Sequence, residues 1–162
     1  MSRAGTGGAM SEMTPYYKTK LEEGLRFQDV ATRELYQRGI VIVGYSSRHF
    51  QFNEGENMLG AEIKRDGRYC ETGNLYIETA EKSNANNEHF IKSGIHREDN
   101  SWLYVIGDET ILYIFSTNYL RMLEKQFAGT RWKRKVIKMG TSKGFLIPKE
   151  DAEKYAIRII NL

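Results

Sequence analysis

One helix-like segment followed by several strand-like segments restricts this chain to a mixed α/β fold. The helical segment runs from Thr14 to Arg38. Thr14 can cap it, Pro15 stands at the favoured first position, and Gly39 ends it. One side of this helix is marked by residues at three-to-four spacing with two apolar residues beside them: Leu21, Leu25, Gln28, Thr32 and Leu35, with Phe27 and Ala31.

Short β-type segments punctuated by glycines follow the helix. Strands are predicted at Ile40–Tyr45, Phe50–Asn53, Leu59–Asp66 and Asn74–Thr79, as two strands within Trp102–Phe115, and at Gly144–Ile147 and Ala156–Ile160. Helices are predicted at Asn86–Ser93, from Thr117 or Asn118 to about Gln126, and from Pro148 onward. This order predicts an α/β or α+β domain with a mixed central β-sheet flanked by helices.

The length of 162 residues suits one domain with its own core. We expect residues 1–12 to be a disordered arm or a cloning remnant and residues 13–162 to form the single domain. No apolar run approaches the length that a membrane span needs, so no membrane partner is expected. The single cysteine, Cys70, cannot form an internal disulfide, which favours a cytoplasmic location.

Charged residues alternate along one predicted strand and continue on the next. In a strand, alternate side chains share a face, so Glu62, Lys64 and Asp66 project together. On the following strand, Tyr76 and Glu78 share a face in the same way. If the two strands are neighbours, Asp66 and Glu78 can converge on one cation with Lys64 beside them. The alternative is a purely structural role, in which these charges form cross-strand ion pairs on a solvent-facing sheet.

Two acids and a lysine are the groups that phosphodiester hydrolysis needs. Mg²⁺ is held by one or two carboxylates and keeps several waters. The bound cation lowers the pKa of a water and neutralises charge on the phosphate. A nearby lysine can orient that water and stabilise the transition state. Two uncompensated acids repel each other, which favours a functional use for such a pair.

The spacing from Asp66 to Glu78 resembles the Asp-x(n)-Glu core of PD-(D/E)XK nucleases, a superfamily that includes restriction enzymes and Holliday-junction resolvases. The long helix that ends at Gly39, followed by a strand, matches that family's order of elements. The strings Gly55-Glu56-Asn57, Gly60-x-Glu62-Ile63-Lys64-Arg65-Asp66, Thr72-Gly73-Asn74-Leu75-Tyr76-Ile77-Glu78 and Ser93-Gly94-Ile95 are similar to phage or phage-derived members. The resemblance covers roughly residues 17 to 115.

This resemblance implies a restriction-endonuclease-like αβββαβ core and a Mg²⁺-dependent endonuclease acting on DNA, with Mn²⁺ as a substitute. Asp66, Glu78 and the carbonyl of Thr79 would hold the cation, and Glu62 would tune the attacking water. Ser93 and His96 are minor candidates that would line the DNA cleft. Structure-selective cutting of junctions or branched DNA is expected, and homodimerisation would allow both strands to be cut. A phage-encoded protein would act in the host cytoplasm.

The chain departs from the family pattern at Ala80, where a lysine usually stands two residues after the second acid. Lys64 is the favoured replacement because it shares the Asp66 face, and Lys82 could instead fold back. A third register makes Glu62-Ile63-Lys64 the acid-x-lysine element, with Glu54 or Glu56 upstream. The family's opening helix often carries another acid near the metal, for which Glu23 and Gln28 are minor candidates.

A basic segment follows these elements. From Arg121 to Lys143 there are eight basic residues and one acid, Glu124. Such a stretch can neutralise backbone phosphates, although a solvated face is an equal alternative. The predicted nucleic-acid contacts are Arg131, Lys133, Arg134, Lys135 and Lys138. The rival hypothesis is a non-catalytic nucleic-acid-binding protein derived from a nuclease fold, in which this segment acts and the acids are structural. A third option is a small regulatory protein that uses its sheet to bind a protein partner.

Overall fold

The computed structural model describes residues 15–40, 60–99, 101–127, 136–138 and 140–162. The predicted strands at 40–45 and 50–53 fall outside the described residues, apart from Ile40. Five helical elements are described: α1 (Pro15–Gln37), α3 (Tyr69–Thr72), the 3-10 helix η1 (Gly94–His96), α4 (Thr117–Phe127) and α5 (Lys149–Tyr155). The described strands are β1 (Ala61–Arg65), β2 (Asn74–Glu81), β3 (Ile91–Lys92), β4 (Leu103–Gly107), β5 (Ile111–Ser116), β6 (Val136–Lys138), β7 (Ser142–Pro148) and β8 (Arg158–Asn161).

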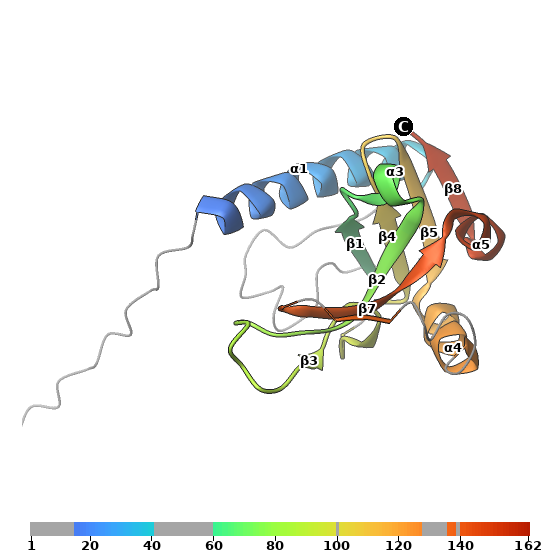
Figure 1. Ribbon diagram of the computed structural model, residues 1–162. Helices are drawn as coiled ribbons and strands as arrows, with labels where there is room; N and C mark the ends of the chain where they lie inside the picture. Colours follow the sequence, from blue (N-terminus) through green and yellow to red (C-terminus); the bar gives the residue numbers. More distant parts are fainter. Residues whose placement is uncertain (1–14, 41–59, 100, 128–135, 139) are drawn as a thin grey trace, which may run out of the picture.

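The strands form two sheets, which confirms the mixed α/β class. The first sheet is mixed and has the order β1-β4-β5-β8, with β1 parallel to β4 and the other pairs antiparallel. The second sheet is antiparallel and has the order β3-β2-β7-β6. In Figure 1, β2 and β7 lie in front of β1, β4 and β5, with α1 along the upper side.

Two apolar cores lie on the two faces of the first sheet. On one face, Phe27, Ala31 and Leu35 of α1 pack against a cluster that includes Ile63 and Val105. This stripe follows a helix face of i, i+4 spacing. Leu25, which was expected on the apolar side of the helix, is 48% exposed instead, because it lies off that stripe.

The second core lies between the two sheets. It joins Tyr104 and Phe115 of the first sheet to Leu75 and Ile77 of β2 and to other buried residues. Side chains alternate across a strand, and Glu62 is in register with Tyr104. Glu62 therefore faces the second sheet, whereas its neighbour Ile63 faces α1.

β1 and β2 belong to different sheets, and this corrects the expectation that they are neighbouring strands. β1 pairs with β4, and β2 pairs with β3 and β7. β1 is thus an edge strand within the described part of its sheet. Any meeting of the two predicted acids has to occur where one sheet lies against the other.

The helix predicted at Asn86–Ser93 is wrong. The segment contains turns and the short strand β3, and η1 follows it. The ammonium of Lys82 binds the carbonyl oxygens of Ala85 and Asn87 at 2.9 and 2.7 Å, and the side chain of Asn84 accepts the amide of Asn86 at 2.9 Å. Local bonds of this kind compete with helix formation, because they engage the same backbone groups.

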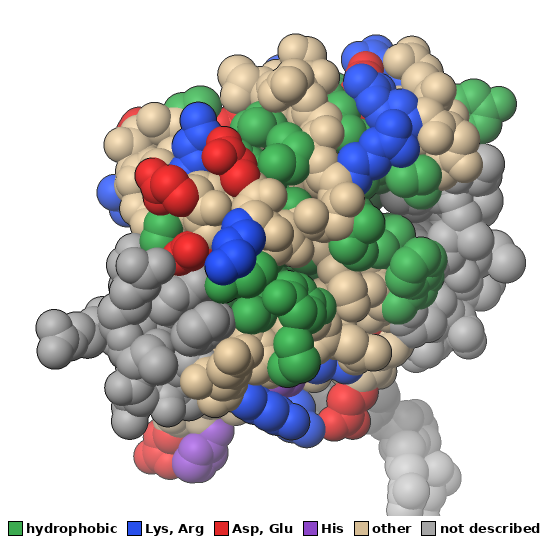
Figure 2. Space-filling model, turned by 90° about the vertical axis from the view of Figure 1, so that its right-hand side faces the viewer, with side chains coloured by type: hydrophobic (Ala, Val, Ile, Leu, Met, Phe, Trp, Pro, Cys, Tyr) green, Lys and Arg blue, Asp and Glu red, His purple; other side chains and the backbone are tan. Residues whose placement is uncertain are grey.

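The remaining predicted elements within the described residues are present with small shifts of their ends. Gly107 begins the turn between β4 and β5, where a Cβ atom would lie 1.9 Å from the carbonyl oxygen of Ile111. On the side that carries α4, α5 and β8, apolar side chains gather at the surface (Figure 2). Exposed large apolar residues of α4, of β8 and of the positions that flank β8 are Met122, Ile157, Ile159 and Leu162. Among the described helices, none combines the length and apolar character needed to cross a membrane.

Candidate active site

Glu62 is a fully buried acid on the polar face of β1. Its side chain is 1% exposed, and its two oxygens contact two cations. Oε1 lies 2.8 Å from Nζ of Lys64, and Oε2 lies 3.5 Å from Nη1 of Arg97. Both contacts are ion pairs, and neither Glu62 oxygen accepts a hydrogen bond of good geometry from a described residue. Burying a carboxylate is unfavourable unless nearby charges compensate it, and Lys64 and Arg97 supply that compensation.

Tyr104 connects this acid to the second sheet. It lies beside Glu62 in the β1–β4 register and is fully buried. Burial raises the pKa of the Tyr104 phenol far above its usual range; nearby Lys64 opposes this rise, and the carboxylates of Glu62 and Glu78 add to it. Charged side chains from both sheets therefore influence the pKa of the Tyr104 hydroxyl.

Asp66 lies directly after β1 and holds backbone amides. Its Oδ1 accepts the N–H of Arg68 at 3.1 Å, which closes the turn that leads into α3. Its Oδ2 accepts the N–H of Tyr76 at 2.8 Å. Asp66 thus contacts the edge of β2 that β7 does not occupy, although β1 and β2 share no ladder.

Glu78 is held from two sides on β2. The hydroxyl of Ser93 donates to its Oε1 at 2.8 Å, and the hydroxyl of Ser142 on β7 donates to its Oε2 at 3.1 Å. Gly94 permits this contact with η1, because a Cβ atom there would lie 2.2 Å from the carbonyl oxygen of Glu78. The carbonyl of Thr79 accepts the N–H of Ser93 at 3.2 Å.

These contacts define one group of side chains, which we call the seam cluster: Glu62, Lys64, Asp66, Glu78 and Tyr104. Tyr76, which binds Asp66, is two residues before Glu78 on β2. Two residues along a strand span about 7 Å. Asp66 therefore contacts β2 about two residues from the position of Glu78, while Glu62 and Lys64 form an ion pair on β1.

Lys82, the alternative lysine, is held elsewhere. Besides its bonds to the carbonyls of Ala85 and Asn87, its ammonium lies 4.8 Å from the ring centre of Phe90. These contacts fix it within its own loop. Lys64, in contrast, contacts an acid of the seam cluster.

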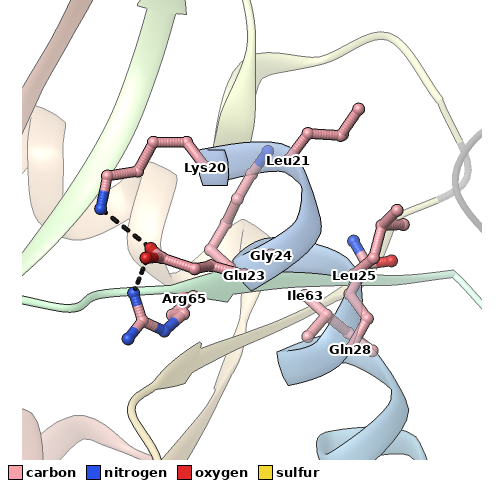
Figure 3. Close-up of a pocket in the computed structure, with 9 residues that line it drawn as sticks. Lys20, Leu21, Glu23, Gly24, Leu25, Gln28, Ile63 and Arg65 are labelled. Atoms are coloured by element: carbon pink, nitrogen blue, oxygen red, sulfur yellow. Dashed lines mark hydrogen bonds and ion pairs between the residues drawn. The ribbon is translucent and has the colours of Figure 1, made fainter. Parts of the chain in front are cut away.

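Glu23 and Gln28 lie on the other side of β1. They line a pocket of about 240 Å³ between α1 and β1 together with Arg65 and Lys64 (Figure 3). Glu23 accepts Lys20 at 2.9 Å and Arg65 at 3.1 Å, as the dashed lines in Figure 3 show. The hydrogen bond from Lys20 lowers the pKa of the Glu23 carboxyl. Glu23 and Gln28 are thus close to β1, but they lie on the face of β1 that α1 covers.

The remaining predicted contacts are spread more widely. His96 ends η1, and its Nε2 contacts Oε2 of Glu124 on α4. Lys138 belongs to β6 and pairs with Lys143 in the ladder to β7. The other four predicted basic contacts fall outside the described residues: Arg131, Lys133, Arg134 and Lys135.

The acids of the seam cluster have the chemistry to hold a divalent cation. A carboxylate offers about four lone-pair positions. Asp66 and Glu78 each accept two hydrogen bonds here, one at each oxygen, so each keeps acceptor capacity. Among the described residues no group of three or more His, Cys, Asp or Glu side chains is placed to hold a metal ion. Two carboxylates completed by waters are the ligand chemistry that Mg²⁺ uses in proteins.

Three residues of this site were not found from the sequence: Arg97, Tyr104 and Ser142. Each one reaches the acids from a distant part of the chain. An isolated arginine, tyrosine or serine has no spacing signal that could have indicated this. Comparisons with protein-family models, curated proteins and solved structures gave no match.

Proposed function

We propose that this protein is a metal-dependent endonuclease that hydrolyses DNA phosphodiester bonds at the seam cluster. The observation that carries this proposal is that Asp66 binds β2 at the amide of Tyr76, two residues before Glu78. Lys64 stands on β1 two residues before Asp66. The resemblance to PD-(D/E)XK nucleases motivates the choice of DNA as substrate.

Each residue of the seam cluster that takes part in hydrolysis has its own role. Asp66 and Glu78, with the carbonyl of Thr79, hold the cation. The bound cation supplies a water of lowered pKa and neutralises charge on the phosphate. Lys64 stabilises the negative charge that develops on the phosphate in the transition state. Glu62 holds Lys64 in place through their contact at 2.8 Å.

The energetics of the cluster favour a functional role. Buried ion pairs contribute little net stability, because the loss of hydration offsets the attraction. A structural core at this position would be served equally well by apolar residues. Perturbed and buried titratable groups concentrate at functional sites, and the seam cluster contains Glu62 and Tyr104 in full burial.

The test is cleavage of a substrate panel of linear duplex, flap, four-way junction and single-stranded DNA with Mg²⁺ or Mn²⁺. Glu78→Gln and Asp66→Asn should remove activity while folding is retained. Lys64→Ala should lower the rate on the order of 100-fold. Lys82→Ala is the matched control and should leave the rate unchanged. Loss of activity in Lys82→Ala with retention in Lys64→Ala would contradict this assignment.

A second candidate is a nucleic-acid-binding protein without catalysis. One observation favours it: all three acids of the seam cluster already have protein partners. In that case the acids stabilise the junction between the sheets. This candidate predicts salt-sensitive DNA binding and no products with either cation on any substrate.

A further inference from the structure

A second polar pocket lies between η1 and α4. It has a volume of about 320 Å³. Its lining contains four cationic side chains, one histidine and two carboxylates: Lys92, Arg97, Arg121, Lys125, His96, Glu98 and Asp99. The lining comes from β3, η1, α4 and the segment that follows η1. Its charge and its concave shape suit a small anion rather than an apolar ligand.

The two carboxylates of this pocket are engaged. Glu98 binds the ammonium of Lys92 at 3.0 Å. Asp99 accepts the amide of Ser101 at 2.8 Å and lies 4.0 Å from Nε of Arg97. Both carboxylates therefore already have partners within the chain. They leave two cations of the lining without a carboxylate partner among the described residues, namely Arg121 and Lys125.

Arg121 is satisfied in hydrogen bonds but not in charge. Its guanidinium donates to the carbonyl oxygens of Ile95 and Arg97 and to Oδ1 of Asn118. All three acceptors are neutral. The bonds fix the guanidinium rigidly against η1, and its positive charge remains available to an anion. A guanidinium held in this way is well suited to phosphate, because little freedom is lost on binding.

Lys125 reinforces this charge. It follows Arg121 by four residues on α4, so both side chains share one helix face. Its side chain is exposed and lines the same pocket. Two cations on one face and a concave surface between η1 and α4 form a compact positive site.

Arg97 links this pocket to the seam cluster. It lines the pocket, and its Nη1 also lies 3.5 Å from Glu62. We propose that the pocket is a phosphodiester-binding subsite, which holds one backbone phosphate of a nucleic acid while the seam cluster acts on another phosphate of the same strand. This inference rests on the proposed function, and it adds the residues that position the substrate.

The experiment measures DNA binding apart from cleavage. A fluorescently labelled duplex is titrated with the full chain in EDTA at several salt concentrations. The variants are Lys125→Ala and Lys125→Glu, and the matched control is Lys18→Ala on α1. In Figure 1, α1 lies at the upper left and α4 at the lower right, so the control is remote from the pocket. Inorganic phosphate is tested separately as a ligand and as a competitor.

Loss of one phosphate contact should lower the slope of log K against log salt by about 1 in Lys125→Ala. Lys125→Glu should weaken binding further, and Lys18→Ala should match the wild type. An unchanged slope in both Lys125 variants would overturn the subsite, even if Mg²⁺-dependent cleavage is present. A lowered slope without cleavage would support the subsite and count against hydrolysis. Phosphate binding that is lost in Lys125→Glu, in a wild type that does not bind DNA, would overturn the nucleic-acid assignment.

Discussion

Asp66 accepts the backbone N–H of Tyr76 at 2.8 Å and thereby joins the end of β1 to the edge of β2. The Asp66→Asn substitution keeps the shape but turns one acceptor into a donor. Because Asp66 also binds the amide of Arg68, one backbone amide must lose its partner. We expect a loss of about 1–3 kcal/mol in the free energy of unfolding, measured by urea denaturation. Asp29→Asn on the exposed face of α1 is the control and should change it by less than about 0.5 kcal/mol.

Glu62 and Lys64 should be energetically coupled. Among the described residues, Lys64→Ala leaves the buried carboxylate with Arg97 as its remaining cation, and Glu62→Gln removes the charge itself. We therefore expect Lys64→Ala to destabilise less in the Glu62→Gln background than in the wild type. A double-mutant cycle by urea denaturation should give a coupling of about 1–3 kcal/mol. Strict additivity would show that the pair makes no contribution in solution.

Gly94 and Gly24 should respond oppositely to alanine. At Gly94 the φ angle is +50°, and a Cβ atom would lie 2.2 Å from the carbonyl oxygen of Glu78. Gly94→Ala should therefore displace η1 and destabilise the protein by about 2 kcal/mol or more. Gly24 lies inside α1, where an added Cβ atom would have nothing within 4 Å, so Gly24→Ala should stabilise by up to about 1 kcal/mol. Thermal denaturation of both variants checks the pair, and equal effects would contradict the packing described.

Asp108 should make part of the stability depend on acid pH. Burial alone would raise its pKa, but hydrogen bonds from Cys70, from the hydroxyl and amide of Thr110 and from the amide of Ile111 hold the pKa below its usual range. A carboxyl with a lower pKa in the folded state stabilises the fold above its unfolded pKa. This stabilisation is lost as the pH falls through the folded value.

The test is the unfolding free energy of wild type and Asp108→Asn between about pH 5 and pH 2, because the ordinary Asp pKa is about 3.9. The wild type should lose more stability over this range than the variant. Parallel curves would show that Asp108 does not contribute to the acid sensitivity. Glu88→Gln provides a control at an exposed position.

The sequence predicted local structure well where local chemistry decides it. Pro15 and the three-to-four spacing from Leu21 to Leu35 indicated α1, and the apolar runs around Gly107 indicated β4 and β5. The pairing of the strands could not be predicted in the same way. It depends on contacts between residues far apart in the chain, such as Ala61 with Leu103. For this reason β1 and β2 were expected as neighbours, although they belong to different sheets.

The candidate site could be predicted to the same extent: the features that depend on local alternation could be predicted, and the contacts between distant residues could not. Alternation along β1 placed Glu62 and Lys64 on one face, and this holds in the structure. Ser93, a minor candidate, contacts Glu78 directly. The part played by Arg97 could not be anticipated, because its contact with Glu62 depends on how η1 packs against β2.

The burial of Tyr104 between the sheets has a spectroscopic consequence. Because its phenol is shielded from water and faces carboxylates from both sheets, it resists ionisation while the sheets stay docked. Alkaline titration of the ultraviolet absorbance should therefore show a late step that includes Tyr104 and Tyr69, because burial raises the pKa of both phenols. Tyr104→Phe would remove the Tyr104 part of that step, and the difference from the wild type would report whether the two sheets are together.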